Sequence, residues 1–476
     1  MSRVRALRDV GARGEVAVIG LGASGRAAAR LLARAGAAVY ASDAGKADAV
    51  AQSAAALGAD GIAAEAGRHD LARIGRAGMV VVSPGVPPDA PPLVAARAAG
   101  VPVISEVELA LRALPGVPYV GVTGTNGKTT TTALIAHLLR ALGHETVEAG
   151  NIGTPLADVA LTAWGDADLR EAGAAMAGHR PDWMALELSS FQLHDTPSVA
   201  PTVAVLTNLA PDHLDRYASL EAYYGDKDRL FANAAAGSTR VVNADDAEVL
   251  RRTAGVPGTA RTFSLRDPAA DAWYDAANRR LMLAGEPLLD RALLPLLGDH
   301  NVANALAAAL AVWWAHPAHR TADARRRLAE GLTGFRAIKH RLEPVGEIGG
   351  VLWINDSKAT NIGAARVALE GMTRPTILLL GGRHKGEPYT AMLDAVRDHA
   401  KVVLAFGEAA PLIEADLAAH VPLERLGSSF EQVIARARAL AAPGDVVLLA
   451  PACSSYDMFK NYEDRGATFR RLALGS

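Results

Sequence analysis

The sequence predicts an α/β protein of three domains, on three observations. The chain has 476 residues, whereas one domain usually contains roughly 100–200 residues. Short β-branched runs alternate with longer Ala- and Leu-rich segments, as in strand–helix–strand units with parallel sheets. Breaks near residues 107–117 and glycines at 331 and 334 interrupt this alternation. We therefore expect domains at residues 1–110, 111–336 and 337–476.

The first domain opens with an apolar run, a glycine turn and an Ala-rich segment, which is the order of a strand–turn–helix unit. Gly36 ends the expected helix, and the second strand leads to Asp43. A Pro-rich stretch at 86–92 follows the third strand. Strands are expected at residues 16–19, 37–41, 79–82 and 103–104, with one helix ending near 35 and another at 106–114.

In the second domain, a polar glycine loop separates a strand from a helix that ends near Leu142. The Ala-rich segment Ala305–Ala315 is shorter than the ~20 residues of a membrane span and favours a buried helix. Strands of this domain are expected at 119–122, 183–188, 202–206 and 240–243. Those of the third domain are expected at 351–354, 376–380, 401–406 and 445–449.

Composition and charge exclude several classes of protein. The formal net charge is −2, so the chain has no overall positive field for a nucleic-acid backbone or an anionic membrane. Aromatic residues make up only 5%, which leaves few stacking surfaces for single-stranded nucleic acid. The single cysteine, Cys453, cannot form an internal disulfide, and the Arg-rich N-terminus precedes no apolar run. We expect a cytoplasmic protein without membrane insertion.

Residues 124–130, Gly-Thr-Asn-Gly-Lys-Thr-Thr, lie between an expected strand and an expected helix. The backbone N–H groups of such a loop, together with the start of the helix, converge on phosphate oxygens. Lys128 would reach the β- and γ-phosphates, and the Thr129 hydroxyl would bind Mg²⁺. This chain has Val122 where the usual P-loop spacing has a glycine. The alternative is a glycine-rich turn with a surface lysine.

With this loop, the chain resembles the Mur ligase family of ATP-dependent amide-forming enzymes, which also includes the folylpolyglutamate synthetases. The resemblance implies a Rossmann-like N-terminal domain, a central P-loop ATPase-like domain with a mostly parallel sheet, and a Rossmann-like C-terminal domain. It also implies ATP and two Mg²⁺ ions. The further motifs that follow in the family's order are Asn151-Ile-Gly153, Glu187-Leu-Ser-Ser190, Asn208-Leu-Ala-Pro-Asp-His213 and His300-Asn301-Val-Ala-Asn304.

For three residues, the role that the sequence alone indicates differs from the role that the resemblance implies. Glu187 leaves a buried strand beside the phosphate loop and suits a Mg²⁺ ligand, but without the resemblance a capping or salt-bridged glutamate is favoured. His213 alone is an ordinary surface histidine. Lys227 alone is a solvated lysine, whereas it matches the family's carbamylated lysine, whose negative charge suits a site with two metal ions. The implied catalytic set is Lys128, Glu187, His213 and Lys227, and the implied metal ligands are Thr129, Glu187, His213 and carbamylated Lys227.

The nucleotide site that the resemblance implies draws on two domains. Asn301 matches a residue that contacts the nucleotide, and three residues of the third domain would face the nucleotide and the transferring phosphoryl group. The full set is Gly124, Thr125, Asn126, Gly127, Lys128, Thr129, Thr130, Asn301, Arg341, Asp356 and Lys358.

The turn Gly20-Leu-Gly22-Ala-Ser-Gly25, with Asp43 after the next strand, fits a dinucleotide fingerprint and alone indicates NAD. The same backbone amides bind any pyrophosphate, including that of a UDP-sugar. Combined with Ser83-Pro84-Gly85, the turn resembles the UDP-binding domain of the Mur ligases that add D-glutamate. The implied UDP-substrate residues are Gly22, Ser24, Asp43, Ser83, Asn151, Ser189 and Gln192.

The third domain indicates which amino acid is added. Its motifs, Lys339-His-Arg341, Asn355-Asp-Ser-Lys-Ala-Thr360, Gly381-Gly-Arg-His-Lys385 and 451–466, resemble those of the D-glutamate-adding members. Two carboxylates on the substrate require cations, hydroxyls and N–H groups. The implied D-glutamate residues are Thr360, Lys385, Ser455 and Tyr462. Residues 164–180 lengthen one connection beyond the family's pattern, and we expect a surface insertion there.

The resemblance implies ligation of D-glutamate to UDP-N-acetylmuramoyl-L-alanine through an acyl phosphate, in peptidoglycan precursor synthesis. Three other readings stay open from the residues: ligation of another amino acid or of folate, an NAD-dependent oxidoreductase, and a P-loop switch or motor. We expect only small-molecule partners, which are the UDP-substrate, D-glutamate and ATP, and a monomer.

Overall fold

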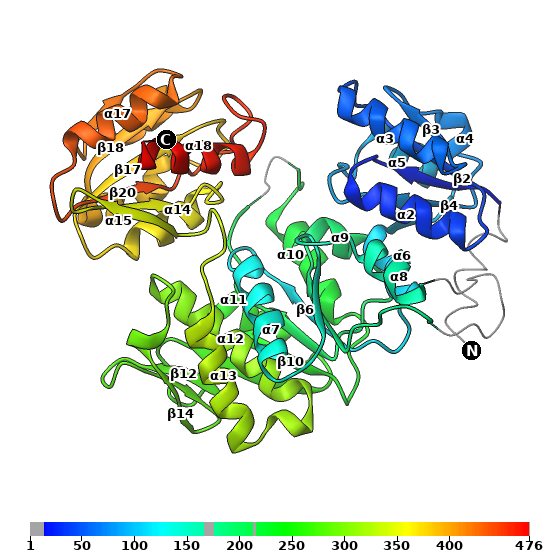
Figure 1. Cartoon of the computed structure of the whole chain (residues 1–476), viewed down its shortest axis with the longest axis horizontal. Helices are drawn as coiled ribbons and strands as arrows, with labels where there is room; N and C mark the ends of the chain where they lie inside the picture. The colour runs from blue at the N-terminus through cyan, green and yellow to red at the C-terminus, as the bar shows by residue number, and fades with distance from the viewer. Residues whose placement is uncertain (1–13, 166–175, 213–215, 476) are drawn as a thin grey trace.

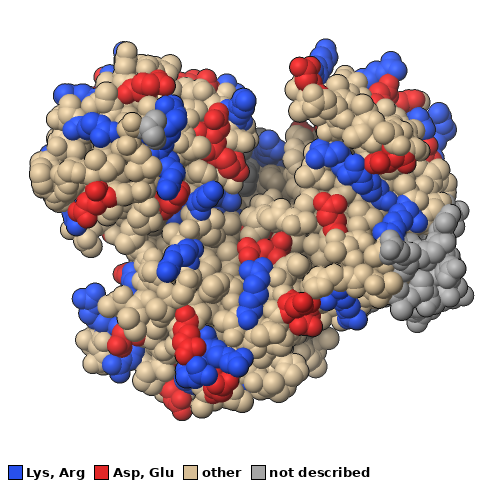
Figure 2. Space-filling model, viewed as in Figure 1, with Lys and Arg blue, Asp and Glu red and all other residues tan. Residues whose placement is uncertain are grey.

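The structure, a computed structural model, describes residues 14–165, 176–212 and 216–475. Within these ranges it contains three sheets, one in each of three lobes (Figure 1). The N-terminal and C-terminal lobes both sit on the central lobe and face each other across a hollow (Figure 2). Basic and acidic side chains are intermixed on the face shown, in keeping with the formal net charge of −2 (Figure 2).

The N-terminal sheet has five parallel strands in the order β3-β2-β1-β4-β5. Both faces are covered by helices, so the central strand β1 is fully buried. The strands are β1 (Val16–Ile19), β2 (Val39–Asp43), β3 (Ala63–Ala66), β4 (Met79–Val82) and β5 (Val103–Ser105). The helices are α2 (Ala23–Arg34), α3 (Asp48–Ala59), α4 (Leu71–Ile74) and α5 (Pro91–Ala98).

The central sheet has nine strands in the order β14-β13-β12-β11-β10-β9-β6-β8-β7. It is parallel from β7 to β12 and ends in an antiparallel meander, so the expected mostly parallel sheet is confirmed. The strands are β6 (Tyr119–Thr123), β7 (Thr146–Gly150), β8 (Trp183–Glu187), β9 (Val203–Leu206), β10 (Thr239–Asn243), β11 (Thr259–Ser264), β12 (Ala272–Asp275), β13 (Arg280–Leu283) and β14 (Glu286–Asp290).

The helix α12 (Asp299–Ala315) packs against α7 (Lys128–Ala141) and the sheet. Its Ala305–Val312 stretch is completely buried, as expected of a core helix. Within the described ranges, no helix is both long and apolar enough to cross a membrane. The remaining helices are α6 (Glu106–Ala113), α8 (Leu156–Trp164), α9 (Ser190–His194), α10 (Leu220–Asp228), α11 (Ala247–Thr253) and α13 (Ala322–Gly334), with 3₁₀ turns η1 (Arg229–Phe231), η2 (Arg291–Leu293) and η3 (Pro317–His319).

The C-terminal sheet has the order β15-β16-β20-β17-β18-β19, parallel except for β15. Its strands are β15 (Glu343–Ile348), β16 (Val351–Asn355), β17 (Thr376–Gly381), β18 (Ala400–Phe406), β19 (Leu423–Arg425) and β20 (Val446–Leu449). Its helices are α14 (Ile362–Glu370), α15 (Leu393–His399), α16 (Ala410–Leu417), α17 (Phe430–Leu440) and α18 (Tyr462–Leu474), with the 3₁₀ turn η4 (Tyr389–Met392).

Helix α6 joins the first two lobes, because it packs against both α2 and α8. Our boundary at residue 110 falls inside this helix, and the three domain limits stay predictions. The expected surface insertion at 164–180 is wrong at its first residue. Trp164 is buried, and its indole N–H donates to the Ala113 carbonyl at 2.8 Å, since the aromatic ring fills the space between α8 and α6. Residues 166–175 lie outside the described residues.

Candidate active site

The loop between β6 and α7 has the shape of a phosphate cradle. Gly127 adopts φ +81°, and a Cβ there would lie 2.4 Å from the Asn304 amide oxygen, so only glycine fits without a shift. The loop is held from behind, since the Asn126 N–H donates to the Asn208 side chain at 2.9 Å. The Lys128 ammonium donates to the Gly124 and Thr125 carbonyls at 2.9 and 2.7 Å. The expected phosphate loop therefore forms despite Val122.

Glu187 ends β8 beside this loop and is buried. Its Oε1 accepts from the Asn151 amide at 2.9 Å, whereas its Oε2 is buried without a hydrogen-bond partner among the described residues. Burial favours the neutral acid, but Lys128 and Lys358 outweigh it and lower the pKa of Glu187 below its ordinary value. A buried carboxylate oxygen in need of a partner, next to the Thr129 hydroxyl, fits the oxygen ligands that Mg²⁺ prefers.

Lys227 reaches the same loop from α10. The side chain is 1% exposed, its Nζ donates to the Gly124 carbonyl at 2.7 Å, and it lies 4.5 Å from the centre of the Tyr223 ring. Burial, reinforced by Lys128, lowers the pKa of Lys227 well below its ordinary value. The solvated-lysine reading of Lys227 is therefore wrong, and burial favours the neutral form of the amine, which is the form that reacts with CO₂. His213 lies outside the described residues.

Two cations from the C-terminal lobe meet the loop at Thr129. The Arg341 guanidinium donates to the Thr129 hydroxyl at 2.7 Å, and the Lys358 ammonium donates to it at 3.4 Å. Burial lowers the pKa of Lys358 to about 8 and raises that of Asp356 to about 6. Asn301 faces inward, where its side chain bonds the Leu297 carbonyl and the Asn304 amide. The structure thus brings Arg341 and Lys358 of the C-terminal lobe to the phosphate loop, while the binding of a nucleotide by the expected residues stays a prediction.

A cavity of about 990 Å³ extends from this loop to the glycine turn of the N-terminal lobe. All three lobes contribute to its wall. The Asp43 carboxylate accepts from the Leu21 and Gly45 N–H groups at 2.9 and 2.8 Å and holds the turn in place. The expected substrate residues that line the cavity are Gly22, Ser24, Asp43, Ser83 and Asn151, alongside Thr129, Lys358 and Tyr462.

Models of three protein domains match the chain in order. The Mur ligase MurD-like N-terminal domain matches residues 14–105, the Mur ligase middle domain 122–312, and the Mur ligase glutamate ligase domain 340–453. A relative from Acidobacterium capsulatum, named UDP-N-acetylmuramoylalanine–D-glutamate ligase, is 42% identical over 465 residues, covering 97% of this chain and 96% of the relative. The chain belongs to the Mur ligase family.

Other relatives agree with this assignment. A protein of the same name from Myxococcus xanthus is 42% identical over 96% of this chain and 97% of its own length. Among solved structures, the UDP-N-acetylmuramate–alanine ligase of Thermotoga maritima has a TM-score of 0.59 at 20% identity, covering 97% of this chain and 98% of its own, which supports the fold. Membership of the Mur ligase family accounts for the glycine turn at 20–25 and for the phosphate loop at 124–130 together. The alternatives of an NAD-dependent oxidoreductase and of a P-loop switch or motor each rest on one of these turns, and so they lose their support.

The C-terminal lobe of this Mur ligase brings some of the expected D-glutamate residues together. The Lys385 ammonium lies 3.5 Å from the Thr360 hydroxyl. Lys385 also lines a small pocket beside Asp212 and Asn361, whose side chains are hydrogen-bonded at 3.0 Å. Ser455 is buried on the loop after β20, and Tyr462 begins α18 and lines the large cavity instead.

Cys453 lies beside this pocket but is not equipped as a nucleophile. The thiol is buried and 3.0 Å from the Tyr389 hydroxyl, and burial raises the pKa of Cys453 to about 11.

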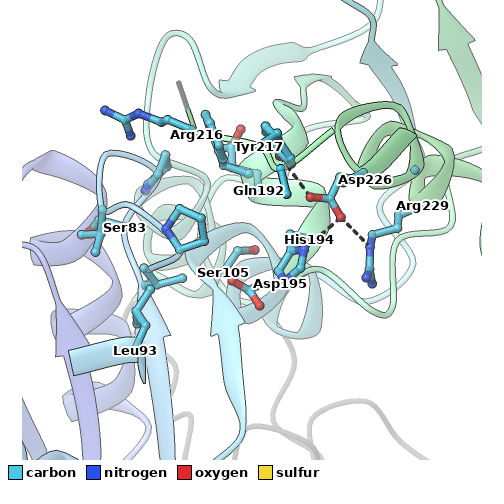
Figure 3. Close-up of a pocket in the computed structure, with 18 residues that line it drawn as sticks. Ser83, Leu93, Ser105, Gln192, His194, Asp195, Arg216, Tyr217, Asp226 and Arg229 are labelled. Atoms are coloured by element: carbon cyan, nitrogen blue, oxygen red, sulfur yellow. Dashed lines mark hydrogen bonds and ion pairs between the residues drawn. The ribbon is translucent and has the colours of Figure 1, made fainter. Parts of the chain in front are cut away.

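Ser189 and Gln192 have a structural role that the sequence motif did not indicate. They form a capping box at the start of α9, with the Ser189 hydroxyl accepting from the Gln192 N–H at 3.2 Å. Gln192 lines a separate cavity of about 500 Å³ between the N-terminal and central lobes (Figure 3). Their contact with a substrate stays a prediction.

Two residues of the site were missed from the sequence. Asn304 supports Gly127 and accepts from the Thr131 hydroxyl at 3.2 Å, although its motif signalled only Asn301. Arg465 is completely buried and donates to the Ser357 and Cys453 carbonyls at 2.8 and 3.1 Å. Arg465 falls within the motif at 451–466, but nothing in that motif indicates that its side chain is buried.

Proposed function

We propose that this Mur ligase joins D-glutamate to UDP-N-acetylmuramoyl-L-alanine and converts ATP into ADP and phosphate, as a step of peptidoglycan precursor synthesis. Full-length relatives named for that reaction, at 42% identity, support the choice of substrates. The observation that carries it is the junction at Thr129. There a phosphate loop, a buried carboxylate and two cations from another lobe meet beside a cavity shared by all three lobes.

A carboxylate is a poor electrophile, so it must be activated before it can form an amide. The γ-phosphoryl group would pass to the alanyl carboxylate, giving an acyl phosphate, and the D-glutamate amine would then displace phosphate. Lys128, Arg341 and Lys358 lie at the phosphate loop and Thr129, from where they would stabilise the charge of the transferring phosphoryl group. In this proposal a different lobe holds each of the three substrates, so most of the catalysis would come from holding them in line.

The residues present fit two Mg²⁺ ions, which would neutralise phosphate charge during transfer. Glu187 Oε2 and the Thr129 hydroxyl oxygen lie beside the loop and could each act as a metal ligand. A carbamate on Lys227 would add a third, with His213 as the remaining expected ligand. In this proposal Glu187 Oε2 would help to hold one ion. Its Oε1 accepts from the Asn151 amide and would fix that side chain toward the UDP-substrate.

D-Glutamate would lie between the C-terminal lobe and the loop. Lys385 and Thr360 are close enough to bind one carboxylate together, and a half-buried Tyr462 at the start of α18 offers its backbone N–H. The Ser455 hydroxyl would complete the set. All reactants are small anionic molecules, which is consistent with a monomer working in the cytoplasm.

The experiment is a phosphate-release assay in the presence of ATP and Mg²⁺, in which the UDP-substrate and the amino acid are each omitted in turn. Mass spectrometry then identifies the product. Release is expected only when UDP-N-acetylmuramoyl-L-alanine and D-glutamate are both present. A panel that includes L-glutamate, L-lysine and diaminopimelate tests the amino acid. Equal rates with L-glutamate, or release without the UDP-substrate, would contradict the proposal.

The role of Lys227 has its own test. Lys227→Ala removes the amine that would carry the carbamate, so ligation is expected to fall by about 100-fold or more, as for other groups that touch transferring phosphate. Short carboxylic acids are expected to restore part of the activity, because they can supply the missing anion. Full activity of Lys227→Ala without any such rescue overturns the role.

A further inference from the structure

Asp226 is the neighbour of Lys227 on α10, but the two side chains make contacts on different sides of the helix. Lys227 bonds the phosphate loop, whereas Asp226 lines the cavity between the N-terminal and central lobes (Figure 3). The Asp226 side chain is 11% exposed and accepts three hydrogen bonds. The donors are His194 Nδ1 at 2.9 Å, Tyr217 Oη at 3.0 Å and Arg229 Nε at 3.0 Å (Figure 3).

The donors come from separate segments of the central lobe. His194 ends α9, Tyr217 precedes α10, and Arg229 follows it in η1. Helix α9 starts three residues after Glu187, so the bond from His194 to Asp226 links the element that follows Glu187 to the element that carries Lys227. Tyr217 is fixed in turn, because its ring stacks on Phe191 with centroids 5.4 Å apart.

This link bears directly on the position of the Lys227 amine. The Lys227 Nζ donates a hydrogen bond to the Gly124 carbonyl at 2.7 Å. It also lies over the face of the Tyr223 ring, 4.5 Å from the ring centre. A hydrogen bond of this kind needs a separation of about 2.7–3.2 Å and weakens steeply when its angle falls below about 120°, so it depends on where α10 holds the lysine. The Asp226 carboxylate, directly before Lys227 in the chain, accepts three hydrogen bonds from charged or strongly polar donors. These bonds hold the turn of α10 that carries Lys227.

We propose that Asp226, with His194 and Tyr217, is a positioning network that places the Lys227 amine where its carbamate forms and is held. Asp226 does not touch the reactants, and it acts through Lys227 and α10. The carbamate forms when the neutral Lys227 amine attacks the carbon of CO₂ and loses one proton to solvent. The proposal rests on the function proposed above for Lys227.

Asp226→Asn tests the network, because the amide keeps the shape and one acceptor oxygen but loses the charge that three donors share. Tyr217→Phe removes one bond and keeps the ring that stacks on Phe191. The matched control is Asp228→Asn, on the same helix, where the carboxylate pairs with Arg252 at 2.6 Å and not with α9. Thermal unfolding of all three variants shows whether each is folded.

The first readout is the carbamate itself, recorded by ¹³C NMR of the enzyme equilibrated with ¹³C-bicarbonate, without substrates, with Lys227→Ala as the blank. The second is the bicarbonate concentration for half-maximal ligation. We expect Asp226→Asn to lower carbamate occupancy at a fixed bicarbonate concentration and to raise the half-maximal concentration about tenfold, the effect of losing one charge-assisted hydrogen bond. Tyr217→Phe is expected to lie between wild type and Asp226→Asn, and Asp228→Asn to match wild type.

The outcomes separate this inference from the proposed function. If wild type ligates D-glutamate and Asp226→Asn has the same carbamate signal and bicarbonate dependence, the positioning role is wrong and the function stands. Absence of any Lys227 carbamate in wild type also overturns it. Failure of wild type to ligate D-glutamate overturns the proposed function, while the NMR comparison, made without substrates, still decides the positioning role. Equal losses in Asp228→Asn would show a general effect on α10 and would overturn the inference.

Discussion

At Gly127 of the phosphate loop, both the backbone conformation and the surrounding space exclude a side chain. Its φ of +81° and the 2.4 Å between a Cβ and the Asn304 amide oxygen both oppose a side chain. We expect Gly127→Ala to reduce ligation about 100-fold or more, since the loop must shift away from transferring phosphate. The measurement is kcat/KM for ATP. The control is Gly58→Ala, in α3, where a Cβ meets nothing within 4 Å; an equal loss there, or none at Gly127, contradicts the prediction.

Glu106 gives the protein a pH-dependent stability. It is completely buried at the start of α6, and burial, opposed by the Ala157 N–H at 2.6 Å, raises the pKa of Glu106 to about 7. The folded state therefore keeps a proton that the unfolded state loses near pH 4.5, so this group lowers the free energy of unfolding as pH rises from about 4.5 to 7. The loss is at most about 3.5 kcal/mol, at about 1.4 kcal/mol per pH unit.

Glu106→Gln removes this titration while keeping an acceptor for the Ala157 N–H. Urea unfolding at several pH values is expected to show a fall in the free energy of unfolding between about pH 4.5 and 7 in wild type that is smaller in Glu106→Gln. Glu145→Gln, at an exposed position, serves as the control and should follow wild type. Parallel curves for wild type and Glu106→Gln contradict the assignment.

Residues that carry chemistry in a short motif were predictable from the sequence, and residues that act through packing were not. Lys128 and Thr129 follow from the loop, because their spacing places them on phosphate. Lys227 needed the family resemblance, since its burial depends on α10 folding against a loop about 100 residues away. Asn304 and Arg465 lie within quoted motifs, but their packing roles had no local signal, because the partners Thr131 and Ser357 are distant in sequence.

At the scale of elements, strands were predictable where they are buried and β-branched. The strands β1 and β4 coincide with the expected ranges 16–19 and 79–82. Strand β3 was missed because its sequence, Ala-Ala-Glu-Ala, has low β-propensity, and the strand forms only because it pairs with β2 at the sheet edge. The antiparallel meander β12–β14 was also missed, because its strands have four or five residues each and lie next to exposed turns.

Helix α18 gives an element-scale prediction, because its Arg465 holds two loops of the site. The guanidinium bonds Ser357, next to Lys358, and the Cys453 carbonyl, two residues before Ser455. Arg465→Lys keeps the charge but loses the planar fork. We expect a lower melting temperature and a KM for D-glutamate raised about tenfold, as for a lost hydrogen bond to a charged group. Arg470→Lys, on the same helix with one ion pair to Glu343, should keep the wild-type KM; a similar rise there contradicts the prediction.

At the scale of the whole molecule, the three lobes were predictable from chain length and alternation, but their contacts were not. The sequence has near-neutral charge, so it could not show that cations from the third lobe gather at Thr129 of the second. That arrangement depends on the path of the chain between α13 and β15. It also explains how anionic substrates can bind without a net positive charge, since the recognition is local.

The same contacts predict that the lobes move when substrates bind. Arg341 and Lys358 donate to the hydroxyl that would bind Mg²⁺, so these two cations would have to leave Thr129 when nucleotide and ion bind, and the C-terminal lobe is expected to change its position. Small-angle scattering is expected to show a wild-type radius of gyration above the about 23 Å of a single compact body of this length. With the UDP-substrate and a non-hydrolysable ATP analogue, the radius should fall toward that value as the third lobe closes over the second. Gly127→Ala, with its damaged phosphate loop, should not respond, and unchanged dimensions of wild type with both ligands at saturation would exclude closure.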